Sequence, residues 1–312
     1  MNDLLNIIID KIEKINPLHG KKIRKNVQSF DKNYFERAND FFVKYDNYLK
    51  SINKDLDFGI TAYMKMCADM MYEQITFRQT GEYSYKSYDD VKKRVYDNKE
   101  VMEYHMNGLL LSQFLWRHHY YILLFFLNSL VKYTNVKRYL EVGGGHGLFI
   151  SEAIKVFGNT ATYEIVDISE TSINISKHFL RNNEVGYILD DIYNYNAKDK
   201  YDFLTMGEVL EHVEEPVRLL KRLHNLLNDD GMVFLTVPTN APAIDHIYLF
   251  RNEEDIRKVI HESGFDIIES YSVYSEDVAK EKAEKLNITM IYGAFLRKKF
   301  IKDHKHEKRR NN

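Results

Sequence analysis

The chain has 312 residues, 44% of them hydrophobic, and its 44 Lys and Arg against 46 Asp and Glu give a formal net charge of −2. This length and composition are typical of a globular protein with one large domain or two. The charge is uneven, since residues 136–296 contain 16 basic and 27 acidic residues and so carry −11. Such an acidic region argues against the phosphate backbone of a nucleic acid as partner.

A single cysteine, Cys67, excludes an internal disulfide framework and a cysteine-based zinc cluster. The first residues, MNDLLNIIIDKIEKI, form an amphipathic pattern with acids inside it, unlike a signal peptide. The most hydrophobic stretch, Leu109–Val131, holds Gln113, Arg117 and two histidines near its centre, which a membrane span rarely tolerates. We therefore expect a cytoplasmic protein with no membrane partner and a buried helix over that stretch.

The first 135 residues have the apolar periodicity of helices and almost no alternation typical of strands. Phe30–Ile52 and Ile60–Phe77 are examples, and residues 101 to about 132 predict one long helix that breaks, if anywhere, near Gly108. Residues 1–135 are therefore expected to form an all-helical domain.

From Val136 the pattern changes to strands that alternate with helices. This predicts an α/β fold, a doubly wound, seven-stranded, mostly parallel sheet with one antiparallel edge strand, over residues 136–298. Residues 299–312 are expected to form a basic, disordered tail. The strands are predicted at 137–142, 161–167, 186–190, 201–206, 231–237, 265–274 and 287–298, and the helices at 147–158, 170–182, 214–228, 252–263 and 275–285.

The segment EVGGGHG, residues 141–147, begins with the last two residues of the first predicted strand and precedes a helix. Gly143, Gly145 and Gly147 let the backbone approach a ligand without a Cβ in the way, whereas a tight turn alone needs one or two glycines and no acid. The spacing G-x-G-x-G differs from the G-x-G-x-x-G of dinucleotide sites. Glu141 beside the loop would repel a diphosphate but suits a ligand with an ammonium and a sulfonium, which is S-adenosylmethionine.

Two further acids lie at the carboxyl ends of the next two predicted strands, since Asp167 ends the second strand and Asp191 follows the third. Asp167 lies where a carboxylate accepts hydrogen bonds from both ribose hydroxyls, and Asp191 lies where an acid accepts from the adenine amino group. Ile168 and Ile192, each directly after one of these acids, are expected to sandwich the adenine. Glu164 and Asp190 are the alternates for the two acids.

The segment YDFLTMGEVLEHVEEPVRLLKRLHNLLNDDGMVFLTVPTN resembles the fourth strand, following helix and fifth strand of class I S-adenosylmethionine-dependent methyltransferases of the small-molecule branch. The resemblance covers Val136 to about Lys298. It implies that the N-terminal helices form a lid, with one or two of their tyrosines closing over the ligand, and that His146 departs from the usual loop. It assigns cofactor contacts to Glu141, Gly143, Gly145, Gly147, Asp167, Asp191, Met206, Gly207, Glu208 and His212.

Two regions are expected to face the methyl group. The loop PTNAPAIDHIYLF offers His246 as a base or substrate ligand and Asp245, whose alternative role is to cap a short helix. The long helix offers His119, for which a core or boundary position is the alternative. No metal site is expected from the sequence.

The predicted function is methyl transfer to oxygen or nitrogen of a small-molecule acceptor, with S-adenosylhomocysteine as product. One alternative is an intramolecular displacement on S-adenosylmethionine that releases methylthioadenosine, and another is a non-catalytic S-adenosylmethionine-binding regulator. The expected partner is a small molecule, and a homodimer is possible through the apolar long helix.

Overall fold

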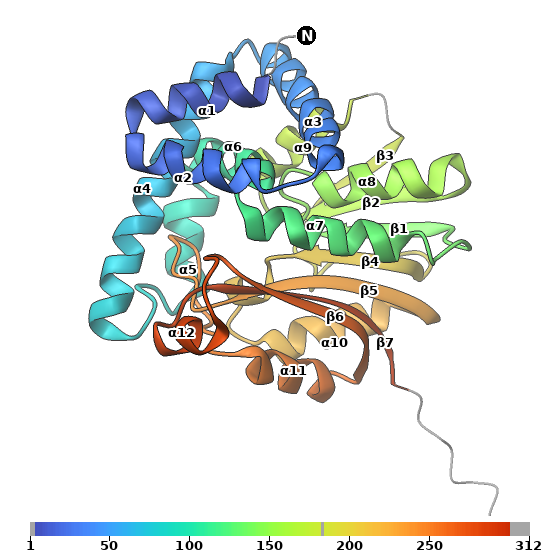
Figure 1. Cartoon of the computed structure of the whole chain (residues 1–312). Coiled ribbons are helices and arrows are strands. Elements are labelled where there is room, and N and C mark those ends of the chain that lie inside the picture. Colours follow the sequence, from blue (N-terminus) through green and yellow to red (C-terminus); the bar gives the residue numbers. More distant parts are fainter. Residues whose placement is uncertain (1–3, 182–183, 300–312) are drawn as a thin grey trace, which may run out of the picture.

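The first six helices gather at one end of the sheet (Figure 1), in a computed structural model that describes residues 4–181 and 184–299. All but three residues at the start of the expected helical domain are therefore described, whereas most of the expected tail, 300–312, lies outside the described residues. The helices are α1 (Leu4–Ile15), α2 (Pro17–Gln28), α3 (Lys32–Ser51), α4 (Leu56–Thr80), α5 (Tyr88–Val91) with a π-turn at Lys92–Tyr96, and α6 (Lys99–Leu115).

Capping residues set the limits of the long helices in this part. Asp31 and Asp55 accept hydrogen bonds from the backbone of Tyr34 and Phe58, so each acid caps a helix N-terminus. Helix α4 ends at Gly81, whose φ of 72° is the left-handed conformation that favours glycine. The faces buried between these helices are rich in aromatic residues, which explains the many tyrosines in the first third of the chain.

The predicted long helix is broken, but the expected position of the break was wrong. The break lies at Trp116, whose backbone is extended, between α6 and α7 (Arg117–Leu130). The Trp116 indole N–H donates to the Tyr63 hydroxyl at 2.8 Å, which holds the bend against α4. Gly108 continues α6 and packs closely on α4, since a Cβ there would lie 2.8 Å from Met66. Among the described residues, no helix has the length and apolarity to cross a membrane.

The sheet has seven strands in the order β3-β2-β1-β4-β5-β7-β6, as expected for a doubly wound α/β fold. The first five strands are parallel to one another. Their bounds are β1 (Arg138–Val142), β2 (Thr162–Asp167), β3 (Val185–Leu189), β4 (Tyr201–Gly207), β5 (Leu227–Thr239), β6 (Phe265–Tyr274) and β7 (Met290–Lys298).

The predicted antiparallel strand is β7, and its place is second from the edge. It pairs antiparallel with β5 on one side and with β6 on the other, so β6 forms the edge itself. The last strand of the chain, β7, therefore lies between β5 and β6, both of which precede it in the sequence.

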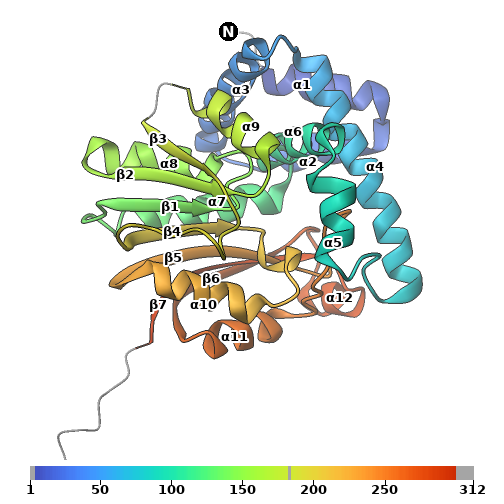
Figure 2. The same ribbon diagram turned by 180° about the vertical axis from the view of Figure 1, so that it is seen from behind.

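Two helical layers cover the sheet, and the alternation of side chains along its strands separates two cores. Tyr139, Phe203 and Phe234 face the core that includes α7, α8 (Leu148–Phe157) and α9 (Glu170–Leu180). Leu140, Leu204 and Leu235 face the core of α10 (Pro216–Leu226) and α11 (Glu253–Glu262), which lie on the opposite face (Figure 2).

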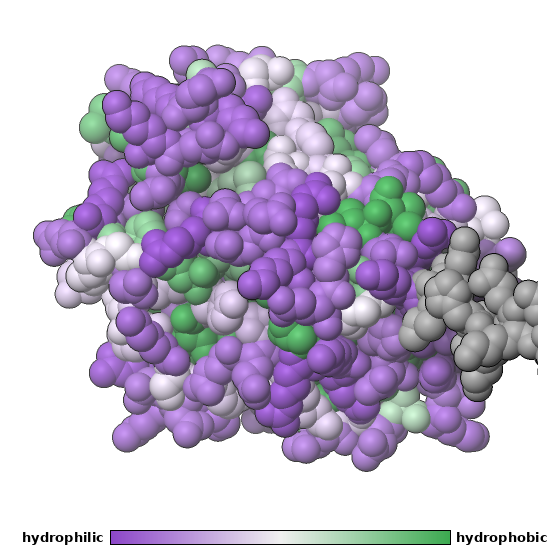
Figure 3. Space-filling model, turned by 90° about the horizontal axis from the view of Figure 1, so that it is seen from below, coloured by the Kyte–Doolittle hydropathy of each residue, from purple (hydrophilic) through white to green (hydrophobic). Residues whose placement is uncertain are grey.

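The remaining short helix, α12 (Lys280–Lys285), lies beside the ends of β6 and β7 near the helical part (Figure 1). Seen from below, the surface is mostly hydrophilic, with small, separate apolar patches (Figure 3). The division of the chain into domains at residues 135 and 136 remains a prediction.

Candidate active site

A cavity of about 780 Å³ lies at the carboxyl ends of the parallel strands, where open α/β sheets bind ligands. Its floor comes from the loops after β1, β2, β3 and β4, and its roof from α6, α7 and the segment around α5. The predicted residues that line it are Glu141, Gly143, Gly145, Asp167, Ile168, Asp191, Ile192, Gly207, Glu208, His212, His119, Asp245 and His246.

The glycine loop forms one wall of the cavity and has left-handed backbone where glycines stand. Gly143, Gly145 and Gly147 have φ of 63°, 49° and 71°. A Cβ on Gly143 would lie 2.6 Å from Val209, so only glycine fits there. Gly147 caps the start of α8 and does not line the cavity, so it shapes the loop from outside.

Glu141 lies one residue before the end of β1, next to this loop, and is almost fully buried. Its Oε2 accepts a hydrogen bond from the Ile150 N–H at 2.6 Å, in the first turn of α8. Burial raises its pKa to about 8, and the nearby Asp167 adds to the effect. A cationic group beside it would favour the ionised form.

Asp167, at the end of β2, connects the glycine loop to the segment that follows β2. Its Oδ2 accepts from the Gly145 N–H at 3.0 Å and its Oδ1 from the Ser169 N–H at 2.8 Å. Burial raises the pKa of this carboxyl, although the backbone N–H groups oppose that rise. A carboxylate has about four lone-pair sites, so it retains acceptor capacity for ligand hydroxyls.

The loop after β3 supplies the third acid. Asp191 lines the cavity and its Oδ1 accepts from the Tyr193 N–H at 2.9 Å, which fixes the turn. Ile168 and Ile192 also line the cavity. The three acids predicted from three successive strands therefore meet at one cavity.

Of the three cofactor residues predicted at the end of β4, two line the cavity and one does not. Gly207 and Glu208 line the cavity, and Glu208 has an unusual φ of 54° for a residue with a side chain. Burial raises the Glu208 pKa to about 7. Met206 instead points into the core beneath α10 and does not line the cavity, because alternation along β4 places it with Leu204.

The helical part contributes cavity residues that the sequence did not identify individually, although one or two of its tyrosines were expected to close over the ligand. Tyr88, Tyr96 and Met106 line the cavity, and the Tyr96 hydroxyl lies 3.0 Å from Nδ1 of His212. A Cβ on Gly145 would meet the Met106 methyl at 2.7 Å, so α6 lies directly over the loop. The amphipathic pattern of α6 gave no signal for this contact, because it depends on how the helices pack.

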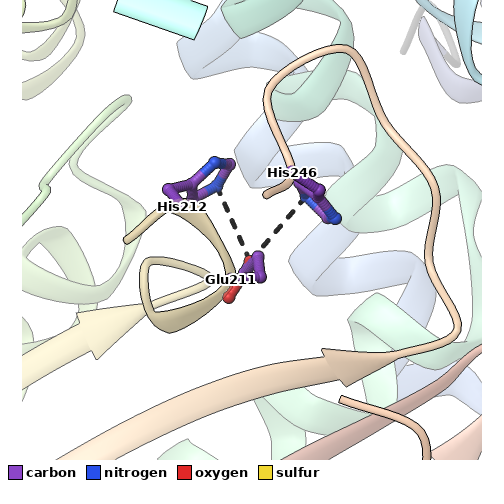
Figure 4. Close-up of side chains that lie close together, drawn as sticks. All are labelled: Glu211, His212 and His246. Carbon is purple, nitrogen blue, oxygen red and sulfur yellow. Dashed lines mark ion pairs between the residues drawn. The ribbon is translucent and has the colours of Figure 1, made fainter. Parts of the chain in front are cut away.

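A polar cluster occupies the far end of the cavity, where β4 and β5 end. It consists of His105 from α6, Glu211 and His212 from the turn after β4, and Asp245 and His246 from the loop after β5 (Figure 4 shows three of them). The Asp245 Oδ2 lies 3.6 Å from His212 Nδ1 and 3.8 Å from His105 Nε2. Burial opposes ionisation of Asp245, but His212, His105 and His246 outweigh it and lower its pKa.

The predicted base candidates differ in their surroundings. Burial lowers the pKa of His246 to about 3, with a further contribution from His212, so its imidazole is neutral at pH 7. His119 on α7 lies elsewhere on the cavity wall, where its Nδ1 is 2.9 Å from the Ser112 hydroxyl. Burial holds the His119 pKa well below its ordinary value.

The fold and this cavity define a Rossmann-like class of protein that binds its ligand at the ends of β1, β2 and β3. A family model described as "Methyltransferase domain" matches residues 115–270, half of the chain. The chain therefore belongs to the methyltransferase domain family. The resemblance to class I S-adenosylmethionine-dependent methyltransferases, stated from the sequence, is confirmed.

Relatives agree with this membership. Over 112 residues the chain is 35% identical to a ubiquinone biosynthesis O-methyltransferase of Coxiella burnetii, covering 34% of this chain and 46% of the relative. Over 95 residues it is 30% identical to malonyl-(acyl-carrier protein) O-methyltransferase 1 of Ilyobacter polytropus, covering 30% of this chain and 35% of the relative. The chain thus spans a third to a half of the length of these curated relatives.

A solved structure extends the likeness of the fold beyond the matched family region. The structure of the mitomycin 7-O-methyltransferase MmcR superposes with a TM-score of 0.52, covers 78% of this chain and 70% of that chain, and is 11% identical. At this identity the likeness concerns the fold alone.

Proposed function

We propose that the chain is an S-adenosylmethionine-dependent methyltransferase that moves a methyl group to oxygen or nitrogen of a small molecule. The observation that carries this proposal is the convergence of Glu141, Asp167 and Asp191 with the glycine loop on one cavity. Three carboxylates around a loop without phosphate-binding spacing suit a cationic nucleoside better than a diphosphate.

The residues present fit the cofactor. Asp167 has free acceptor capacity for the proposed ribose contact, Asp191 lines the same cavity as the proposed adenine ligand, and the buried Glu141 is the proposed partner of the ammonium. When bound, S-adenosylmethionine supplies both the electrophilic methyl group and the leaving group. The protein then has to orient the acceptor, exclude water and, for a hydroxyl, take up a proton.

The acceptor is proposed to lie between the glycine loop and the polar cluster. The cavity is near the upper end of the range for small-molecule sites, about 300–1,000 Å³, which leaves room for an acceptor beside the cofactor. Helix α6 and the segment around α5 line this space, which is the position expected of a lid. The relatives named above are O-methyltransferases, which favours oxygen as the acceptor atom.

The proton-accepting residue is proposed from the polar cluster. His212 lines the cavity, and its Nδ1 lies 3.6 Å from the Asp245 carboxylate, so we assign the role of base to this imidazole. His246, with its pKa of about 3, is a weak base, so we assign it a role as a neutral ligand of whatever binds there. His119, which lines the cavity from α7, is proposed to contact the acceptor.

The test has two stages. Isothermal titration with S-adenosylhomocysteine should give saturable binding, which Asp167→Ala should abolish. Incubation of the full chain with S-adenosylmethionine and a panel of phenols, carboxylic acids and amines should yield S-adenosylhomocysteine and a methylated product. Methylthioadenosine in place of S-adenosylhomocysteine would establish the displacement reaction instead, and no binding of either cofactor form would overturn the proposal.

A further inference from the structure

Three side-chain atoms that can bind a metal ion point toward one another in the polar cluster (Figure 4). The Oε1 atom of Glu211 lies 3.6 Å from Nε2 of His212 and 3.9 Å from Nε2 of His246. Ligand atoms of all three residues lie within 4.8 Å of one another. Two ligands at about 2.1 Å from one ion lie roughly 3–4 Å apart, so the spacing is close to that of a coordination shell.

Both imidazoles turn a lone pair toward Glu211. The Nδ1 atom of His246 lies 2.5 Å from the Ala241 carbonyl, and Nδ1 of His212 lies 2.9 Å from the Asp245 carbonyl. A carbonyl only accepts, so each Nδ1 carries the proton and each Nε2 is left bare. Metal-binding histidines have this arrangement, in which the second ring nitrogen donates to a carbonyl that orients the ring.

Glu211 is the second, independent sign of a bound ion. Its side chain is fully buried, and neither carboxylate oxygen has a hydrogen-bond partner among the described residues. A buried carboxylate without a partner is costly, and two bare nitrogen lone pairs beside it offer no proton. A cation can bind the Glu211 carboxylate and both imidazole nitrogens at the same time.

The backbone fixes the two segments that bring these residues together. The Ile247 and Tyr248 N–H groups both donate to the Glu211 carbonyl, each at 2.9 Å. The loop after β5 is thereby held against the turn after β4, although His212 and His246 are 34 positions apart. These backbone hydrogen bonds fix the relative positions of the segments that carry Glu211, His212 and His246.

We propose that Glu211, His212 and His246 bind one divalent transition-metal ion. Two histidines and one carboxylate suit Zn²⁺, Mn²⁺ or Fe²⁺, and a site with three protein ligands leaves coordination positions open. His212 and His246 line the cavity while Glu211 lies behind them, so the open positions face the cavity. This assigns to the chain a metal that the sequence did not predict.

The ion would also serve the proposed methyl transfer, and this use of the site rests on that proposed function. An acceptor oxygen bound to the ion loses its proton more easily, so in the metal-bound chain the ion takes the place of His212 as the proposed proton-removing group. The acceptor class is then one with an oxygen able to coordinate a metal, such as a phenol with a neighbouring oxygen.

The binding experiment uses metal alone, without cofactor or acceptor. The full chain, free of any affinity tag and stripped with a chelator, is titrated with Mn²⁺ while electron paramagnetic resonance measures the free ion. We expect one ion bound per chain, and an affinity at least about tenfold weaker in Glu211→Gln and in His246→Gln, the scale seen when metal-site residues are lost. Glu211→Asp should retain part of the affinity, since it keeps the carboxylate.

Controls separate this site from adventitious histidines. His261→Ala, an exposed histidine on α11, and the double variant His304→Ala/His306→Ala should bind Mn²⁺ as the unaltered chain does. Circular dichroism shows whether each variant is folded. No saturable binding of Mn²⁺ or Zn²⁺, or equal binding in folded Glu211→Gln and His246→Gln, would overturn the proposal. Binding of S-adenosylhomocysteine is measured separately, so a failure of the metal site is distinct from a failure of the proposed function.

Discussion

The Asp167 carboxylate accepts a hydrogen bond from the Gly145 backbone N–H at 3.0 Å, which ties the end of β2 to the glycine loop after β1. The same carboxylate is the proposed ribose ligand. We expect Asp167→Asn to weaken S-adenosylhomocysteine binding by about 10- to 100-fold, because hydrogen bonds to a charged group contribute about 1.5–3 kcal/mol. Isothermal titration measures the change, with the exposed Asp230→Asn as the matched control. Equal affinity in both variants would exclude Asp167 as a cofactor ligand.

Gly143→Ala tests the fit of the glycine loop. The new Cβ would lie 2.6 Å from Val209 at a φ of 63°, so both a clash and backbone strain of about 1–2 kcal/mol are expected. Gly81→Ala is the matched control, since Gly81 has a φ of 72° and a Cβ there would meet no described atom within 4 Å. Urea unfolding should show a larger loss of stability for Gly143→Ala, and a loss no larger than that of the control would contradict the described loop.

Glu141 predicts a specific pH dependence of stability. Its pKa is about 8 in the folded protein against an ordinary value of 4.5, so the folded state holds the proton more tightly. Between pH 4.5 and 8 the folded state therefore loses stability as pH rises, by up to about 1.4 kcal/mol per pH unit from this group. Glu141→Gln removes that loss. The free energy of unfolding of the variant, minus that of the unaltered chain, should therefore increase from pH 5 to pH 8.

The measurement for Glu141 is the free energy of unfolding in urea at several pH values. Glu262→Gln, an exposed residue of α11, serves as the control and should follow the unaltered chain. A difference between Glu141→Gln and the unaltered chain that stays constant from pH 5 to pH 8 would show that Glu141 titrates near its ordinary value.

Tyr83 connects the helical part to the loop that carries Asp245 and His246. Its buried hydroxyl accepts a hydrogen bond from the Ala241 N–H at 3.0 Å. We expect Tyr83→Phe to lower the free energy of unfolding by about 0.5–1.5 kcal/mol, the usual net contribution of a hydrogen bond. Tyr72→Phe, on an exposed face of α4, should change it by less. Identical losses would mean that the Tyr83 contact does not hold the loop.

The acids of the cofactor site could be predicted because their positions follow from topology. The carboxyl ends of parallel strands meet at one edge of a sheet, so residues at or just after the ends of three predicted strands meet in space whatever the loops do. This is why Glu141, Asp167 and Asp191 were identified together. Met206 was misplaced although a signal existed, since two-residue alternation along β4 puts it on the face of Leu204.

Other features depended on packing that has no local pattern. The break at Trp116 has no glycine or proline to mark it, and it is held by a contact with Tyr63 on another helix. Glu211 and His246 meet because backbone hydrogen bonds to the Glu211 carbonyl fold one loop onto another turn. The sequence EVLEHV indicated a family but gave no sign that the second Glu is buried without a partner.

The position of β7 affects how the chain folds during synthesis. Until residues 290–298 have been made, β5 has a bare edge, although most of its residues are buried in the finished protein. An unpaired strand of this length and apolarity is a template for aggregation. Truncation shortly before Met290 would therefore leave a chain that is prone to aggregate. Synthesis of β7 covers the exposed edge of β5 and removes this tendency.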